Sequence, residues 1–298
     1  MTVDGITANG MTADTARRFG GLERLYGVAG AQAIRQANVA VIGIGGVGSW
    51  AVEALARSGV GQITLIDFDQ VAESNINRQI HAVTDTVGMA KVDAMRQRIA
   101  QINPYCQVNC IEEFATPENW PAMAATGAFT AVIDACDQVK TKIALAAWAR
   151  KAGKAALFIT VGAAGGKRRA DKVDIADLSE VTHDPLLAKL RYNLRRQYGA
   201  PRDKRMGTIC VFSRESVAAS DASRTLEVGA EVGAESDAEG DMQGNAQIDT
   251  QTDGSLNCSG YGSVVSVTAS FGMCAAGWVL DAIALQAMQQ QQPRHLQK

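Results

Sequence analysis

Cysteine is scarce in this chain: six of its 298 residues are cysteines, and none of them forms a C-x-x-C pair. So few cysteines at this length exclude a disulfide-rich scaffold and argue against a structural zinc site built on C-x-x-C pairs. The first 18 residues, MTVDGITANGMTADTARR, also lack the apolar run of a secretory signal. Together these absences predict a protein of the reducing cytoplasm.

The chain has no large excess of either charge, since 29 Lys and Arg stand against 31 Asp and Glu, a formal net charge of -2. That average argues against a polyanionic partner, but the charges are unevenly distributed. Residues 218–253 hold nine acidic residues and one basic residue in a small, polar sequence, for which we expect a disordered insertion. Without this segment the counts are 28 basic and 22 acidic residues, a net charge of +6, so a nucleic-acid partner stays open.

Long apolar runs are also rare, and only one, from Val264 to Ala287, approaches the length of a membrane span. It is rich in Gly and Ala and is interrupted by Ser266, Thr268, Ser270 and Asp281. We therefore expect a buried or interfacial helix, with membrane association as the less favoured alternative.

What the chain does have is a regular alternation of short apolar runs with helical patterns. Strands are predicted at 38–42, 62–69, 108–112, 131–134 and 156–160, and helices at 22–37, 91–102 and 139–151. Another helix is expected directly after the glycine turn that follows residue 42. This alternation predicts an α/β fold with a doubly wound, mostly parallel, Rossmann-like sheet, whose nucleotide-binding domain spans residues 17–165.

Residues 166–217 differ from this domain in charge. Between residues 167 and 214 the sequence has twelve basic and six acidic residues, and residues 184–199 read as a basic helix. We expect this segment to be a basic, helical extension that binds the substrate, and residues 254–288 to return to the domain.

The first predicted strand leads into Gly43-x-Gly45-x-x-Gly48, and a helical pattern follows. Glycines at these positions allow a tight turn and let backbone N–H groups approach a phosphate at a helix N-terminus. Asp67 ends the next strand, where a carboxylate can accept hydrogen bonds from ribose hydroxyls. The turn alone does not distinguish a dinucleotide from ATP.

The residues after Asp67 favour ATP. Arg78 lies in SNINRQ (74–79), Lys91 in GMAK (88–91) and Asp137 in DACD (134–137). An arginine and a lysine suit the charge of a triphosphate, and a carboxylate after a strand can hold Mg²⁺. Each residue alone has an ordinary interpretation, a surface ion pair for the two cations and a helix N-cap for Asp137, but their order after one glycine turn favours ATP.

The segments GIGGVGSWAVEALARSGVGQITLIDFD, SNINRQ, GMAK and DACD together resemble the ThiF/MoeB family, over residues 17–215 and again over 255–285. Members of that family adenylate a carboxylate with ATP and Mg²⁺ and work as homodimers. The resemblance implies phosphate contacts for Asn77, Arg78 and Lys91 and a magnesium ligand in Asp137. The candidate catalytic residues are Arg78, Lys91 and Asp137. The implied nucleotide-binding set is Gly43, Gly45, Gly46, Gly48, Asp67, Asp69, Asn77, Arg78, Lys91 and Asp137.

The second half of the chain departs from ThiF and MoeB, which usually carry two C-x-x-C pairs for zinc. The opening RRFGGLERLYG, the stretch TVGAAGGKRRADKVDIADLSEVTHDPLLAKLRYNLRR and the later NCSGYGSVVSVTASFG are similar to the TcdA (CsdL) branch. That branch implies ATP-dependent dehydration of threonylcarbamoyladenosine in tRNA through adenylation of the threonine carboxylate. The expected tRNA contacts are Lys167, Arg168, Arg169, Lys189, Arg191, Arg195 and Arg196.

Cys258 lies in the glycine-rich NCSGYG, where a packing role and a sulfur-accepting role are equally open. Taken from the branch, it would receive sulfur from a cysteine desulfurase, although ring closure needs no thiol. The resemblance also leaves room for a monovalent cation. We expect structural roles for Cys106, Cys110, Cys136 and Cys274. His81 follows SNINRQ and has a place near the site as one alternative, but a hydrogen-bonded structural role is favoured.

Two other functions stay open. One is an adenylyltransferase that activates the C-terminus of a ubiquitin-like sulfur carrier, which the missing C-x-x-C pairs disfavour, so no ubiquitin-like partner is expected. The other is a non-catalytic scaffold that binds a nucleotide and a desulfurase.

Overall fold

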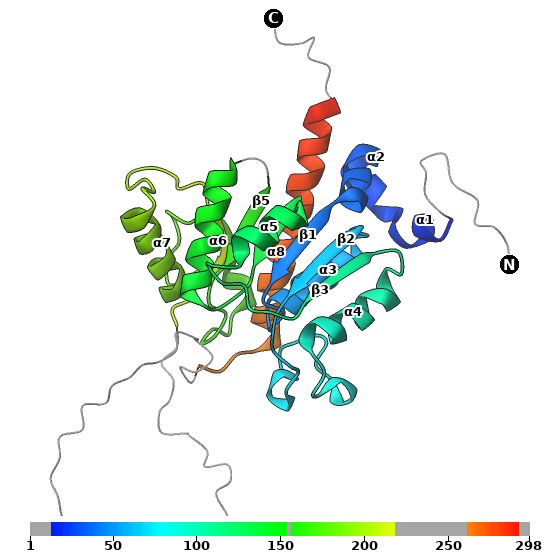
Figure 1. Ribbon diagram of the computed structural model, residues 1–298, viewed down its shortest axis with the longest axis horizontal. Helices are drawn as coiled ribbons and strands as arrows, with labels where there is room; N and C mark the ends of the chain where they lie inside the picture. Colours follow the sequence, from blue (N-terminus) through cyan, green and yellow to red (C-terminus); the bar gives the residue numbers. More distant parts are fainter. Residues whose placement is uncertain (1–12, 154–155, 218–260, 292–298) are drawn as a thin grey trace, which may run out of the picture.

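The sheet of the protein has seven strands in the order β3-β2-β1-β4-β5-β7-β6 in the computed structural model, which describes residues 13–153, 156–217 and 261–291 (Figure 1). The strands are β1 (Asn38–Ile42), β2 (Gln62–Ile66), β3 (Gln107–Ile111), β4 (Ala131–Asp134), β5 (Leu157–Val161), β6 (Val173–Asp177) and β7 (Ile209–Ser213). All neighbours are parallel except β6, which runs antiparallel to β7. The doubly wound, mostly parallel sheet predicted from the sequence is confirmed.

Helices cover both faces of the sheet because successive strand residues point to opposite sides. Val39 and Val41 of β1 join one core cluster, while Ala40 and Ile42 join the other. The first cluster packs against α2 (Gly21–Gln36), α3 (Gly48–Arg57), α4 (Lys91–Ile102) and α8 (Val265–Gln291). The second packs against α5 (Trp120–Gly127), α6 (Val139–Ala152) and α7 (Pro185–Gln197).

The two halves of the sheet wind in opposite directions from the centre. β1 pairs with β2 on one side and with β4 on the other, so the chain order reverses between β1 and β4. In open α/β sheets the crevice at the carboxyl ends of such strands is where ligands bind. The fold thus places the glycine turn after β1 and the DACD segment at the end of β4 at the same crevice.

Residues 166–217 contribute two strands to the sheet. The sequence predicted only a basic helix here, and α7 is that helix, but β6 and β7 were missed. Each is five residues long, and β7 extends the sheet by pairing in parallel with β5. Its buried residues Cys210, Val211 and Phe212 pack on both faces of the sheet, which places the basic segment against the nucleotide-binding half.

The apolar run near the C-terminus forms α8, which begins one residue later than the run and which Figure 1 shows in orange to red, projecting past the sheet. By length and composition Val265–Gln290 could cross a membrane, with a mean hydropathy of 1.5. However, 56% of this apolar stretch is buried inside the protein, and the core helix of a soluble protein can have the same length and composition. Val267, Phe271, Ala275 and Val279 form its buried face at helical spacing, as expected for a buried helix.

The described structure also begins earlier than predicted. Helix α1 (Ala13–Phe19) precedes the first helix predicted from the sequence, at 22–37, and its Phe19 is buried beneath Gly59. Residues 218–253, predicted as a disordered insertion, lie outside the described residues.

Candidate active site

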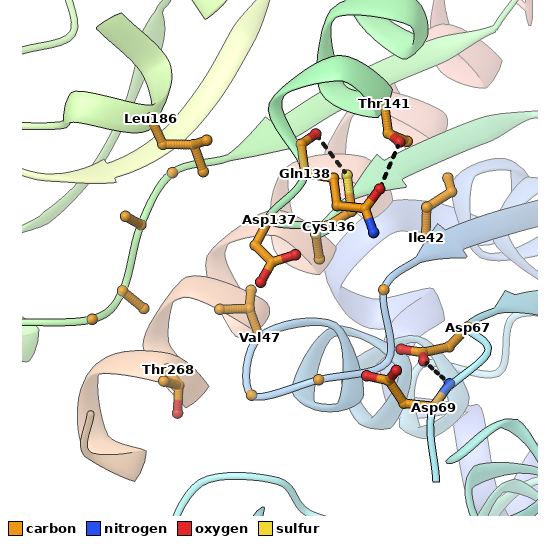
Figure 2. A pocket seen from close by; sticks show the side chains of 18 of the residues that line it. Ile42, Val47, Asp67, Asp69, Cys136, Asp137, Gln138, Thr141, Leu186 and Thr268 are labelled. Atoms are coloured by element: carbon orange, nitrogen blue, oxygen red, sulfur yellow. Dashed lines mark hydrogen bonds between the residues drawn. The ribbon is translucent and has the colours of Figure 1, made fainter. Parts of the chain in front are cut away.

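A cavity of about 430 Å³ opens at the carboxyl ends of the central strands. One half is lined by residues that follow β1, β2, β3 and β4, and the other half by residues that follow β5 and by the starts of α7 and α8. Figure 2 shows Asp67 and Asp69 from the end of β2, Asp137 from the loop after β4, Leu186 from α7 and Thr268 from α8 around it. Its size and place are those of a small-molecule site in an open α/β fold.

The glycine turn after β1 forms the floor of the cavity. Gly43 has a left-handed φ of 84°, and a Cβ there would lie 2.9 Å from the carbonyl oxygen of Ala135. Gly45 and Gly46 line the cavity, whereas Gly48 does not. A Cβ on Gly48 would overlap the carbonyl oxygen of Gly43, so this glycine is needed for the close packing of α3 on the turn. The predicted nucleotide turn therefore divides into three residues at the cavity and one that supports them.

Asp67 is buried at the end of β2 and is bonded at both carboxylate oxygens. Oδ2 accepts from the Ile44 backbone N–H at 2.6 Å, and Oδ1 accepts from that of Asp69 at 2.8 Å. Burial raises the pKa of this carboxyl, against the opposing effect of Lys91 and the two N–H donors. The carboxylate thereby ties the glycine turn to the end of β2 while still lining the cavity.

The two predicted cations, Arg78 and Lys91, both line the cavity. The Lys91 ammonium group lies 2.6 Å from Oδ2 of Asp69 and is nearly buried. The Arg78 guanidinium donates to the Ser74 carbonyl oxygen at 2.6 Å and to Oδ1 of Asn77 at 2.9 Å. Two positive charges on one wall suit a triphosphate.

Asn77 was predicted to contact phosphate, but it lies outside the cavity lining. Its side-chain amide donates to the carbonyl oxygen of Ser263 at 3.0 Å, and its Oδ1 accepts from Arg78. In this structure Asn77 therefore orients Arg78 and connects it to the segment that precedes α8.

Asp137 projects its carboxylate into the cavity from the loop after β4, facing the glycine turn across the space (Figure 2). Carboxylate oxygen is the ligand type that Mg²⁺ prefers, and that ion usually takes one or two carboxylates together with substrate phosphates. The described residues contain no group of three or more His, Cys, Asp or Glu side chains placed to hold a metal. Asp137 thus fits a metal that arrives with a nucleotide and does not fit a resident metal centre.

A buried ion pair lies directly beneath the Asp137 loop. Lys142 Nζ lies 3.0 Å from Oδ2 of Asp134, and neither side chain is exposed to solvent. Thr160 donates to the same oxygen at 2.6 Å, and the Cys136 thiol donates to Oδ1 at 3.0 Å. Burial alone would lower the pKa of Lys142, but the nearby Asp134 carboxylate raises it above its usual value, which favours the ammonium form. These bonds join the end of β4, α6 and β5 around the loop that carries Asp137.

Several residues that line the cavity were not predicted from the sequence to belong to the site. Gln79 is buried, and its Oε1 has no hydrogen-bond partner within the described part of the chain. Phe114, after β3, packs against Phe68 with ring centroids 5.2 Å apart and the rings tilted by 49°. Gln79 stands in the SNINRQ motif next to Arg78, a signal that could have found it, whereas Phe114 is brought to the site only by the pairing of β2 with β3.

The comparisons with known proteins agree with this geometry. The profile of the ThiF family matches residues 19–297. The chain belongs to the ThiF family. It is 40% identical over 279 residues to the tRNA threonylcarbamoyladenosine dehydratase of Escherichia coli, covering 92% of this chain and 96% of that protein.

Two solved structures resemble this ThiF-family protein over nearly its whole length. One is E. coli TcdA in complex with ATP, with a TM-score of 0.76, 37% identity and coverage of 94% of this chain and 98% of that one. The other is the same enzyme in complex with AMP, with a TM-score of 0.76, 36% identity and coverage of 97% and 100%. The resemblance to the TcdA branch inferred from the sequence is confirmed.

Three of the residues predicted to contact tRNA in this ThiF-family protein donate hydrogen bonds to backbone carbonyl oxygens of the protein itself. Lys167 is buried, and its ammonium group donates to the carbonyl oxygens of His183, Ser213 and Glu215. The structure therefore turns the Lys167 ammonium group toward the protein and not toward solvent, where a tRNA phosphate would lie. Arg191 donates to two backbone carbonyl oxygens in the loop after β6, and Arg195 donates to two in the loop after α7. Both side chains are half-buried, and they stabilise these loops.

The other predicted tRNA contacts are exposed, and they remain predictions. These residues are Arg168, Arg169, Lys189 and Arg196. Lys189 and Arg196 are seven residues apart on α7 and so share one face of it. Cys258, the predicted sulfur acceptor, lies outside the described residues. Cys136 lines the cavity, and burial beside Asp134 raises the pKa of its thiol well above the usual value, which disfavours the reactive thiolate.

His81 of this ThiF-family protein is buried without a hydrogen-bond partner at either ring nitrogen among the described residues. Burial and the nearby charges of Lys91 and Arg98 lower its pKa to about 4. It does not line the cavity, but the hydrogen bond expected of its structural role is not found among the described residues.

The low pKa of His81 predicts a loss of stability in acid. Unfolded histidine takes up a proton near pH 6.5, and the folded state resists it until about pH 4, so stability falls as the pH falls through this window. Between pH 7.5 and pH 5 this group should remove about 2 kcal/mol of unfolding free energy. Urea unfolding of His81→Phe should show a correspondingly flatter pH dependence than wild type, whereas equal slopes would contradict the assignment.

Proposed function

We propose that this protein is an ATP-dependent tRNA threonylcarbamoyladenosine dehydratase. The observation that carries the proposal is one cavity in which Arg78, Lys91 and Asp137 surround the glycine turn, while a second half of the same cavity is open for another substrate. Close similarity over nearly the whole chain to dehydratases of that name supports it.

The first step is adenylation of the substrate. The threonine carboxylate of the modified nucleoside attacks the α-phosphorus of ATP, a carboxylate oxygen–phosphorus bond forms, and pyrophosphate departs with the electron pair of the broken bond. Arg78 and Lys91 neutralise the negative charge of the phosphates, and the backbone N–H groups of the glycine turn orient them. Mg²⁺, held by Asp137 and the phosphates, would supply further charge neutralisation.

The second step closes the ring. The carbamoyl group of the same side chain attacks the activated acyl carbon, loses a proton and expels AMP, which carries away the carboxylate oxygen. Both groups belong to one substrate, so the protein contributes positioning and no covalent intermediate.

The second half of the cavity offers room for this modified nucleoside. Gly162, Ala163 and Gly165 follow β5, and Pro185 and Tyr261 also line this half. Small residues in this loop leave space beside Asp137, and the apolar walls of Pro185 and Tyr261 suit a nucleoside more than a flexible peptide tail.

The proposal is tested with purified protein, ATP and an RNA stem–loop that carries threonylcarbamoyladenosine. We expect stoichiometric AMP, pyrophosphate and cyclised nucleoside, the last detected by mass spectrometry. The same RNA with unmodified adenosine is the control. Exchange of labelled pyrophosphate into ATP that is stimulated by a ubiquitin-like protein with a Gly-Gly end, and not by the modified RNA, would replace this function with carrier activation.

Binding of tRNA should weaken steeply with salt, because contacts between cations and phosphates release counterions. The double variant Lys189→Ala/Arg196→Ala removes two exposed charges from one face of α7. The slope of log affinity against log salt concentration should fall by about 1 for each lost contact. Lys140→Ala, an exposed change on α6, is the control and should bind like wild type; equal slopes for all three proteins would remove α7 from the tRNA interface.

The remaining expectations complete the proposal. A homodimer is predicted, and α2 and α8 carry the exposed apolar side chains Leu25, Val28, Leu285 and Met288 as candidates for its interface. A cytoplasmic location, a monovalent cation and a cysteine desulfurase partner stay predictions, as does the dispensability of Cys258 for dehydration.

A further inference from the structure

A second hollow of about 340 Å³ adjoins the main cavity at the start of α7. Pro185 and Val217 line both spaces, so the two are neighbours with these side chains between them. The rest of the hollow is formed by Val181, Thr182, His183, Asp184, Ala188, Arg191 and Ser216. None of these residues has a part in the adenylation steps.

Two planar side-chain groups, the His183 imidazole and the Arg191 guanidinium, line the hollow together with apolar side chains. His183 is exposed, and its Nδ1 lies 3.0 Å from the Thr182 hydroxyl oxygen. The Arg191 guanidinium is held in place by donation to the carbonyl oxygens of Leu178 and Val181, at 3.1 and 2.7 Å. An imidazole and a fixed guanidinium plane are groups on which unstacked bases of RNA pack.

The backbone at His183 is held in place by a buried side chain. His183 has a left-handed φ of 56°, which is uncommon for a residue with a side chain. Its carbonyl oxygen accepts from the buried Lys167 ammonium at 2.9 Å, and the same ammonium donates to Glu215 at 2.6 Å. The imidazole is therefore presented to solvent from a rigid support.

The position of the hollow relative to the main cavity is also fixed by hydrogen bonds. The Asp184 carboxylate is buried, accepting from the Leu187 N–H at 2.9 Å and from the Ala163 N–H at 2.9 Å. Ala163 lines the open half of the main cavity, so one side chain joins the two spaces. Because Asp184 already occupies the N-terminus of α7, a phosphate placed there would meet a carboxylate, which favours a base as the occupant.

We propose that this hollow binds the nucleobase that neighbours the modified adenosine in the RNA, stacked on His183 beside Arg191. The inference rests on the proposed function, because it assumes that the modified nucleoside occupies the open half of the main cavity. Pro185 and Val217 then separate two adjacent nucleotides of one strand, as an RNA loop with splayed bases requires. Exposed Lys189 on the next turn of α7 is available to the backbone of the same strand.

The test uses stem–loops that carry the modified adenosine with an abasic site at the 5′ or the 3′ neighbour. One of the two should be cyclised with kcat/KM lowered about 5- to 100-fold relative to the intact RNA, the usual range for a lost base stack. His183→Asn, which suits a left-handed backbone, should lower kcat/KM for intact RNA similarly and cause no further loss on that abasic RNA. His183→Phe should restore most of the activity, and Tyr198→Ala, at the far end of α7, is the control.

Binding gives a readout that does not depend on turnover. With 2-aminopurine at the sensitive neighbour, its fluorescence should change on binding to wild type and to His183→Phe, and much less with His183→Asn. Equal turnover of intact and both abasic RNAs, or equal fluorescence changes for wild type and His183→Asn, would overturn the inference. If no RNA is cyclised, the proposed function fails, and the fluorescence change still decides whether the hollow holds a base.

Discussion

Replacing Asp137 with alanine should reduce formation of AMP and cyclised nucleoside by about 100-fold or more. Its carboxylate projects into the cavity opposite the glycine turn and is the fitting ligand for a nucleotide-bound Mg²⁺. Loss of a group that stabilises charge developing at a phosphate usually costs about 10²- to 10³-fold in rate. Quenched assays of AMP release at saturating ATP measure the effect.

The Asp137→Ala protein should also lose the effect of Mg²⁺ on ATP affinity, which calorimetry with and without the metal would measure. Asp85→Ala, a change at an exposed acid after the SNINRQ segment, is the matched control and should retain wild-type turnover. Full turnover by Asp137→Ala would remove this residue from the reaction.

Replacing Lys142 with methionine should destabilise the protein by about 3–5 kcal/mol. The change leaves the Asp134 carboxylate buried without its cation, and removing one partner of a buried ion pair carries a cost of that order. Urea unfolding followed by far-ultraviolet circular dichroism gives the free energy. The Asp137 loop, which follows Asp134 directly, should become less ordered and ATP binding should weaken with it.

The double variant Asp134→Asn/Lys142→Met should be less destabilised than the sum of its single variants, because neither charge is then left alone. Lys140→Met, an exposed change on the same helix, should have little effect. A Lys142→Met protein as stable as Lys140→Met would show that the pair is not ionised in the fold.

Much of the nucleotide half could be predicted from residues close together in the sequence. The glycine turn, the strand that ends at Asp67 and the GMAK and DACD motifs each combine a local backbone pattern with one polar residue. Because parallel strands bring their carboxyl ends to one edge of the sheet, residues after β1, β2 and β4 had to meet there. The structure places Arg78, Lys91 and Asp137 around one cavity accordingly.

The substrate half could not be predicted in the same way. Lys167 stands next to two exposed arginines, Arg168 and Arg169, and nothing in the sequence distinguishes them. Its burial follows from three backbone carbonyl oxygens that come from the residue before Asp184 and from the end of β7. A count of positive charge therefore identified a basic segment but not which of its side chains face solvent.

The sequence by itself determined the α/β architecture, the nucleotide turn and the family, because these depend on periodicity and short motifs. Only the tertiary structure decided which charged side chains can contact a ligand. Asp134 and Lys142 form a closed pair, Lys167 supports a loop, and His183 stands exposed at a second hollow. The physical reason is that burial and hydrogen-bond partners come from segments 8 to 48 residues apart in the chain, and they set whether a charged side chain binds a ligand or the protein itself.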